Sequence, residues 1–323
     1  MTSTRWILLV CALIAAMILA VAIGTIRIPV SDVWTALWGA NDTVPAMVVR
    51  HLRLPRVCLA VLVGAGLGMS GAALQGAMRN PLAEPYLLGV SGGAAVGAVV
   101  ASALGVAASI LPVAAFVGAI GAVAAAIAMA RAAGVRGDSR MLLMAGVVVG
   151  AFANAVIMVV LANAEPNTVR NALWWMMGSV SDATWTQIGV LLVYLVIGGT
   201  ALILLGRQID ILALGEDAAA GLGLDADAAI RRVFITASLV AAATVAAAGL
   251  VGFVGLVVPH LVRAAGVRRH RQLLVGSALA GATVLVLSDL LGRILRPPAE
   301  LPLGAVTALI GVPFFLAKLR RLA

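Results

Sequence analysis

The sequence predicts an all-α polytopic membrane protein, a bundle of about ten transmembrane helices. Hydrophobic residues make up 63% of its 323 positions and charged residues only 11%, less charge than the surface of a soluble domain of this length needs. The mean hydropathy is +1.13. Many apolar residues also fall into runs of about 20, the length at which a helix crosses a bilayer core of ~30 Å.

Ten apolar segments follow one another along the chain. The break at 79–85 contains Pro81 and Pro85, which interrupt a helix, so it predicts a loop between two spans. The eighth segment is short and contains Pro259, which predicts a broken or partly inserted helix. The segments lie near residues 6–26, 54–78, 86–107, 112–132, 141–163, 188–206, 233–250, 254–266, 272–293 and 303–319.

The first segment has one feature of a secretory signal, a basic residue before an apolar run. That run, 6–26, is about 21 residues long, whereas the apolar core of a signal peptide has roughly 7–15. We therefore expect an uncleaved first helix.

Two longer polar stretches interrupt the pattern. The stretch 164–187 contains Trp174, Trp175 and Trp185, as expected of aromatic anchors at a membrane interface. The stretch 207–232 holds five of the thirteen acidic residues. Its glycines at 215, 221 and 223 predict two short helices joined by tight turns.

The basic residues predict the orientation. If the N-terminus is inside, ten crossings return the C-terminus to the inside, and 15 of the 22 basic residues then lie inside and seven outside. This bias follows the positive-inside rule. We therefore expect a multi-pass protein of the inner (cytoplasmic) membrane with both termini cytoplasmic. Five of the seven outside residues form two clusters: Arg50, Arg53 and Arg56, and Arg293 and Arg296.

Small residues recur four positions apart within the apolar segments. In lipid such spacing is typical of closely packed helices, because small residues let two backbones approach. A match to the dinucleotide fingerprint at 66–71 (GLGMSG) lies inside a span with no preceding strand, so it does not indicate a nucleotide site. The small pairs are Gly64 and Gly68, Gly93 and Gly97, Gly146 and Gly150, and Ser277 and Gly281.

The composition excludes several kinds of site. Lys318 is the only lysine, so no Walker A loop is present, and ATP hydrolysis would need a separate subunit; we expect no enzyme activity and no catalytic residues. The two cysteines and three histidines show no metal-ligand spacing, and we expect no metal site and no cofactor. The charges lie singly in loops, which argues against nucleic-acid binding.

A secondary transporter driven by an ion gradient is the competing functional class. Such proteins use intramembrane carboxylates or histidines as proton or sodium sites. Asp289 is the one candidate here. It either lines a path or pairs with Arg293 one helical turn further on.

Seven motifs in order resemble those of the FecCD family, the permease subunits of ATP-binding-cassette (ABC) importers for iron-siderophores, haem and cobalamin. They extend over nearly the whole chain, and their combination is far more specific than any single motif. The motifs are 52–56 (LRLPR), 80–85 (NPLAEP), 88–93 (LGVSGG), 175–178 (WMMG), 212–216 (LALGE), 252–260 (GFVGLVVPH) and 300–304 (ELPLG).

The resemblance implies a single transmembrane permease domain over 1–323 that pairs with a second permease chain. We expect a homodimer, although the family contains both homodimers and heterodimers. Two cytoplasmic ATP-binding subunits would power it, and a periplasmic or lipid-anchored binding protein would deliver the substrate. The expected cargo is a metal chelate, a ferric siderophore first, with cobalamin or haem as alternatives.

The resemblance also assigns roles to particular residues. Arginines at the outer clusters would dock acidic residues of the binding protein. Loops after the second and fourth helices would form the cytoplasmic gate, with Asp138 departing from the small hydroxyl residue expected there. The stretch 207–232 would couple to the ATPase. The residues are Arg50, Arg53, Arg56, Arg293 and Arg296 for docking; Asn80, Leu82, Asp138 and Ser139 for the gate; Gly215, Glu216, Asp217, Ala218, Ala219, Gly221 and Gly223 for coupling.

Overall fold

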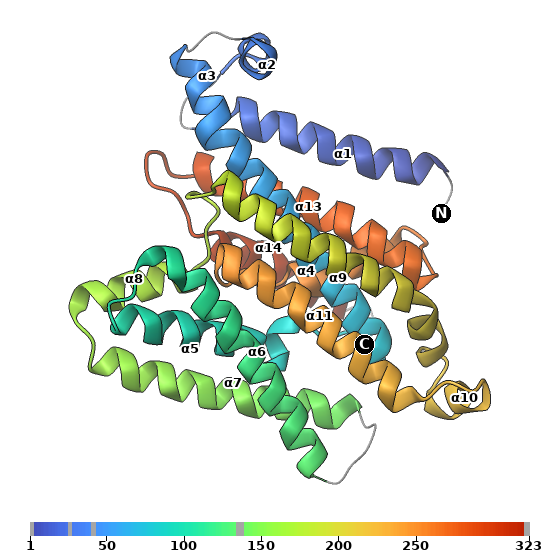
Figure 1. Cartoon of the computed structure of the whole chain (residues 1–323). Helices are drawn as coiled ribbons and strands as arrows, with labels where there is room; N and C mark the ends of the chain where they lie inside the picture. The colour runs from blue at the N-terminus through green and yellow to red at the C-terminus, as the bar shows by residue number, and fades with distance from the viewer. Residues whose placement is uncertain (1–2, 25–27, 40–42, 134–138, 320–323) are drawn as a thin grey trace.

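A computed structural model of the chain describes residues 3–24, 28–39, 43–133 and 139–319 (Figure 1). The described residues form helices and connecting segments, with no strand among them. The long helices lie side by side in one bundle (Figure 1). The predicted all-α architecture is confirmed.

Ten helices correspond one to one with the ten apolar segments. Seven described helices are long and apolar enough to cross a membrane, and α5, α12 and α14 are shorter apolar helices. The ten are α1 (Ser3–Ala22), α4 (Leu54–Ala77), α5 (Val90–Ala103), α6 (Leu111–Ala132), α7 (Ser139–Ala162), α9 (Trp185–Leu212), α11 (Ala226–Ala248), α12 (Val254–Ala264), α13 (His270–Ile294) and α14 (Leu303–Leu319).

Short helices fill the connections at the two ends of the bundle. α2 and α3 follow α1 at one end, and α10 lies at the other, beyond the ends of α9 and α11 that it joins (Figure 1). The short elements are α2 (Val30–Trp38), α3 (Val44–Val48), a π-helical turn at Val49–Arg53, 3₁₀ turns at Pro85–Leu88 and Ala108–Ile110, α8 (Pro166–Met176) and α10 (Glu216–Gly221).

The stretch 207–232 differs from the sequence prediction of two short helices. α9 continues to Leu212, and α10 is the one separate short helix before α11. The physical reason is that Gly206, Ile209 and Leu212 are buried on one face, three residues apart, so the apolar stripe of α9 extends past its polar residues. The prediction of two short helices was therefore wrong.

The central helix α4 packs against α13 through the small residues that the sequence singled out. A Cβ added to Gly64 would overlap the carbonyl oxygen of Gly281, and one added to Gly68 would overlap that of Ser277. The predicted pair on α4 therefore meets the predicted pair on α13, and both backbones approach as close packing in lipid requires.

The connection between α11 and α12 is a break in the helical path. Residues 249–253 are not helical, Phe253 has a φ of +68°, and α12 begins only at Val254. α12 is 11 residues long and contains Pro259. The predicted short eighth helix is confirmed. It is not broken at Pro259, however, because the helix continues through this residue and the break lies before Val254.

Candidate functional site

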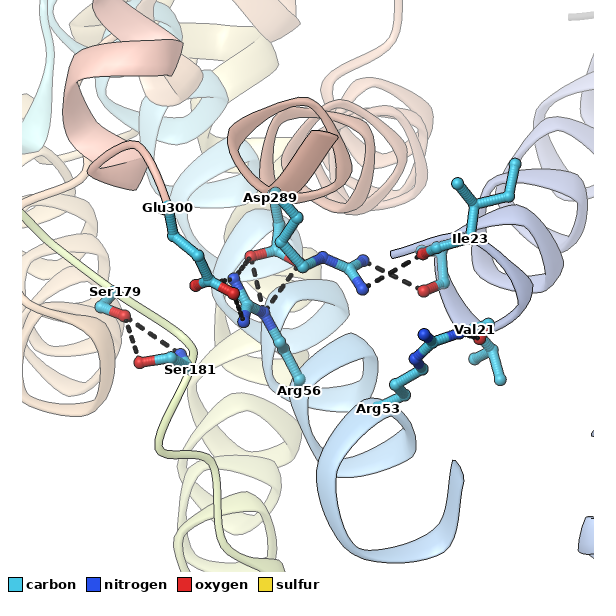
Figure 2. A network of polar contacts seen from close by, with 10 residues as sticks. Val21, Ile23, Arg53, Arg56, Ser179, Ser181, Asp289 and Glu300 are labelled. Carbon is cyan, nitrogen blue, oxygen red and sulfur yellow. Dashed lines mark hydrogen bonds and ion pairs between the residues drawn. The ribbon is translucent and has the colours of Figure 1, made fainter. Parts of the chain in front are cut away.

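Arg56 lies in an ion-pair network that joins α4 to α13 and to Glu300 (Figure 2). Its Nη2 lies 2.7 Å from Asp289 Oδ1, and its Nη1 donates to Glu300 Oε1 at 2.9 Å. Arg293 Nε lies 3.1 Å from the other oxygen of Asp289. The Asp289 side chain is 3% exposed, so two guanidinium groups compensate a buried carboxylate, the condition under which a buried charge is tolerated.

Arg53 and Arg293 bind the end of α1. Arg53 Nη1 donates to the carbonyl oxygens of Val21 at 2.7 Å and Ala22 at 3.0 Å, and Arg293 Nη2 donates to that of Ala20 at 3.0 Å. The last carbonyls of a helix lack intrahelical donors and carry its negative dipole end. The N-terminus of α4 disfavours the charge of Arg53, whereas the C-terminus of α1 stabilises both arginines.

The two remaining outer arginines differ in exposure. Arg50 is half-buried and donates from Nε to the carbonyl oxygen of Ala36 at 2.5 Å and from Nη2 to that of Gly39, at the end of α2. Arg296 lies two residues after the end of α13 and is exposed. Within the described parts of the chain, no hydrogen bond or ion pair is formed by Arg296.

A cavity of about 550 Å³ opens beside this network. Asp289 and Glu300 line it, together with the segment that connects α8 to α9. In that segment the hydroxyls of Ser179 and Ser181 lie 2.8 Å apart (Figure 2), and Asp182 also faces the cavity. Asp289 thus pairs with Arg293, one of the two roles that the sequence left open, and it also lines this cavity.

The first part of the predicted gate is a turn held against α12. Asn80 Oδ1 accepts a hydrogen bond from the backbone N–H of Leu82 at 2.9 Å, which fixes the turn locally. The ring Nε2 of His260 lies 3.0 Å from the carbonyl oxygen of Pro81. The Leu82 side chain is 44% exposed, so it is available to a neighbouring chain.

The second part of the predicted gate lies at the start of α7. Ser139 is the first residue of this helix, and Asp138 lies outside the described residues. The gate role of all four residues therefore stays a prediction.

Two side chains that the sequence reasoning missed bind the start of α12. The backbone N–H of Phe253 donates to Glu84 Oε1 at 2.8 Å, and that of Val251 donates to the hydroxyl of Tyr86 at 2.5 Å. Glu84 is buried. The break before α12 leaves these backbone N–H groups without helical acceptors. Glu84 and Tyr86, in the segment that follows the gate turn, supply the acceptors.

Gln75 likewise bonds a backbone group that lacks a helical partner, in this case a carbonyl oxygen within α12. Pro259 has no N–H to bond the carbonyl oxygen of Gly255 four residues earlier, and Gln75 Nε2 donates to that oxygen at 3.1 Å. Arg263 Nη1 in turn donates to Gln75 Oε1 at 2.7 Å. Two features of the sequence could have indicated this contact: the polar residue Gln75 in an otherwise apolar span, and the proline inside a second helix.

The predicted coupling segment has a glycine turn on each side of α10 and one buried residue within it. Gly215 has a φ of +113° and Gly223 a φ of +77°, conformations that favour glycine, and they bound α10 on either side. Between them Ala219 is fully buried. The turns and this anchor fix the orientation of a helix of six residues.

The rest of α10 forms an exposed surface. Asp217, Ala218 and Gly221 are exposed, and a Cβ added to Gly221 would meet no atom within 4 Å. Leu214 and Leu222, which the sequence reasoning passed over, are 66% and 63% exposed on either side of α10. Exposed leucines beside a small, smooth helix are typical of a protein contact.

Two of the three histidines, His260 and His270, lie in contacts within the chain. His270 Nδ1 lies 2.7 Å from Asp210 Oδ1, and the backbone N–H of His270 donates to the same oxygen at 2.9 Å. Among the residues that the structure describes, no three histidine, cysteine, aspartate or glutamate side chains lie together as metal ligands would.

A bundle with seven described helices that are long and apolar enough to cross a membrane places the chain among multi-pass membrane proteins. It belongs to the FecCD transport family, whose model matches residues 12–321.

Curated relatives agree with this membership. The chain is 38% identical over 322 residues to the uncharacterized ABC transporter permease protein YvrB of Bacillus subtilis, covering 96% of this chain and 91% of YvrB. It is 39% identical to the cobalamin import system permease protein BtuC of Halobacterium salinarum (85% and 73% covered). It is also 36% identical to the hemin transport system permease protein HmuU of Yersinia pestis (82% and 81% covered).

A solved structure shares the fold. This chain superposes with a TM-score of 0.85 and 29% identity, over 97% of both chains, on a chain described as a metal-chelate type ABC transporter in an inward-facing conformation. The protein is therefore a multi-pass membrane permease of the ABC importer class. The family implies separate ATPase subunits, a substrate-binding protein and a permease partner.

Proposed function

We propose that this chain is the single-domain permease of an importer for ferric siderophores, with both termini in the cytoplasm. The observation that carries the transport mechanism is the contact between two predicted regions: Arg79, next to the gate turn, lies against Gly215 and Glu216 of the coupling segment. An ATPase that moves α10 therefore acts close to the gate.

The cargo proposal rests on the relatives. Permeases named for hemin and for Fe(3+)-citrate import are 36% and 34% identical to this chain, so iron chelates recur among them. Cobalamin is the second candidate, favoured by the 39% identity to the BtuC protein of Halobacterium salinarum. The cavity beside Asp289 and Glu300 has the volume of a small-molecule pocket.

An uptake assay separates the two cargoes. The permease, its ATPase and the binding protein encoded beside it are reconstituted in liposomes, and ATP-dependent uptake is measured for a ferric hydroxamate, a ferric catecholate and cobalamin. We expect uptake of a ferric siderophore. Uptake of cobalamin alone would contradict the cargo proposal and leave the importer mechanism standing.

We further propose that the binding protein docks on the end of the molecule that carries the arginines. Arg296 and the partly accessible Arg56, whose side chain is 13% exposed, would contact its acidic residues. Arg50, Arg53 and Arg293 would support that surface from within, because each holds the end of α1 or α2.

A homodimer closed by the gate turns is the third part of the proposal. Leu82 is replaced by cysteine in a background with Cys11→Ser and Cys58→Ser. We expect a disulfide-linked dimer that blocks uptake and is released by reduction. If no inter-chain product forms in any nucleotide state, Leu82 does not approach a two-fold axis and the proposed gate is wrong.

A further inference from the structure

A groove runs along the outside of the bundle between α1 and α12, with α13 as its floor. Its volume is about 340 Å³. α1 contributes Arg5, Leu8, Leu9 and Ala12, which share one face of the helix because they are three or four residues apart. The other two helices contribute Leu261, Val262, Ala265, Ala280, Thr283 and Val284.

The groove lies where lipid is the surrounding medium. α1 lies at the edge of the bundle (Figure 1), and its side chains at Ile7, Leu8 and Ile14 are 50% exposed or more. Both α1 and α13 are long and apolar enough to span a membrane. The hydroxyl of Thr283, the polar side chain on the groove floor, donates to the carbonyl oxygen of Leu279 at 2.8 Å, so the walls offer apolar surface to an occupant.

The mouth of the groove carries positive charge. Arg5 lies at its end, and its Nη1 donates to the carbonyl oxygen of Ala265, at the end of α12. Arg5 packs against Gly266, and two residues further on Arg268 and Arg269 are exposed. A guanidinium has five N–H donors, so Arg5 retains donors for an anion. Among the described residues that line the groove, none has an acidic side chain.

From these features we infer that the groove binds one anionic phospholipid, with an acyl chain between α1 and α12 and the phosphate at Arg5. The lining face of α1 extends about 10 Å along the helix at 1.5 Å per residue, most of the ~15 Å that one leaflet contributes to the bilayer core. Basic pockets between membrane helices bind acidic headgroups in the same way. This site is independent of the cargo and of the docking surface.

Native mass spectrometry of the detergent-purified permease tests the inference. The protein is incubated with equal amounts of phosphatidylglycerol and phosphatidylcholine of the same chain length, and the bound lipid is counted. We expect the wild-type protein to retain phosphatidylglycerol in preference to phosphatidylcholine. Arg5→Gln should lower its retention about fivefold, and Arg5→Lys, which keeps the charge, should restore it.

A second variant tests the groove separately from the charge. Ala280→Leu fills the floor and should release the lipid although Arg5 is intact, whereas Ala125→Leu, on an exposed face of α6, should not. Arg131→Gln, an exposed arginine at the end of α6, is the charge control.

Three results would overturn the inference. The first is equal retention of the two lipids by wild type. The second is unchanged phosphatidylglycerol binding by Ala280→Leu, which would mean that only a headgroup is held. The third is displacement of the bound lipid by millimolar glycerol phosphate, which would mean that a soluble phosphate suffices.

Discussion

Arg79 and Glu216 lie 3.8 Å apart, Nη2 to Oε1, and join the turn that follows α4 to the start of α10. Both side chains are more than 40% exposed, so the pair itself contributes little to stability. Its importance is its position. Arg79 directly precedes the turn that contains Asn80 and Leu82, and Glu216 begins the exposed helix, so a movement of α10 has a short path to the predicted gate.

The arginines at the outer end predict a separation of docking from folding. We expect Arg296→Glu to weaken association with the binding protein several-fold and to change its salt dependence, because several charges on a large interface set orientation and association rate. Thermal stability should not change, since Arg296 is exposed. Affinity is measured as the binding of the soluble binding protein to permease immobilised on a surface.

The control is Arg170→Glu, an exposed arginine on α8. Arg56→Glu is unsuitable as a docking test, because reversing Arg56 also breaks its pairs with Asp289 and Glu300. If Arg296→Glu binds with the affinity and salt dependence of wild type, the docking role of this arginine is wrong.

We expect that neutralising the two carboxylates of the ionic network lowers the stability of the protein by unequal amounts. Asp289→Asn leaves the buried Arg293, 4% exposed, without its anion, and removal of one partner from a buried pair costs about 3 kcal/mol or more. Glu300→Gln removes a carboxylate that is 40% exposed and should cost under ~1 kcal/mol. Thermal unfolding in detergent measures both. Equal small losses would show that Asp289 is not a structural partner.

Much of the fold could be predicted from the sequence, because hydropathy gives the position and length of each membrane-spanning segment. The meeting of Gly64 and Gly68 with Ser277 and Gly281 was half predicted: small residues indicate close packing, but not which helix faces which. Contacts such as Arg56 with Asp289, 233 residues apart, depend on the order of helices in the bundle. Local patterns do not contain that order.

The candidate sites were predicted to different extents. The coupling segment stood out because it is too polar to span a membrane. The binding of α12 by Glu84 and Tyr86 was missed, because a buried carboxylate that accepts a backbone N–H looks, in sequence, like any loop glutamate. α2 was missed because its nine residues mix apolar side chains with Ser31 and Asp32 and are too short for a span.

Because α4 and α13 approach closely, we expect one added methyl group at their contact to lower the stability of the protein. Gly68→Ala would place a Cβ against the backbone carbonyl of Ser277, and backbone cannot move aside as a flexible side chain does, so we expect a loss of about 1–3 kcal/mol. Gly150→Ala on α7 meets no atom within 4 Å and should be neutral or stabilising. Thermal unfolding compares the two; equal stabilities would contradict the packing.

The contacts of Gln75 predict a specific role in holding α12. Gln75→Leu keeps the volume but leaves the carbonyl oxygen of Gly255 and the guanidinium of Arg263 without this partner, at a cost of about 1–3 kcal/mol. Gln75→Glu keeps an acceptor for Arg263 and should lose less. Hydrogen exchange of the α12 backbone reports the effect. Protection that is unchanged in Gln75→Leu would mean that α12 is held without this residue.

The central claim is that energy from a separate ATPase enters through α10. Its most direct test is ATP hydrolysis by the cognate ATPase reconstituted with Gly221→Val permease, beside Gly121→Val as control. Neither added side chain meets an atom of the described chain within 4 Å of its Cβ, so both proteins should fold and insert. We predict that Gly221→Val loses ATPase association or stimulation and substrate uptake, whereas Gly121→Val keeps both. Wild-type assembly, hydrolysis and uptake in Gly221→Val would remove α10 from the mechanism.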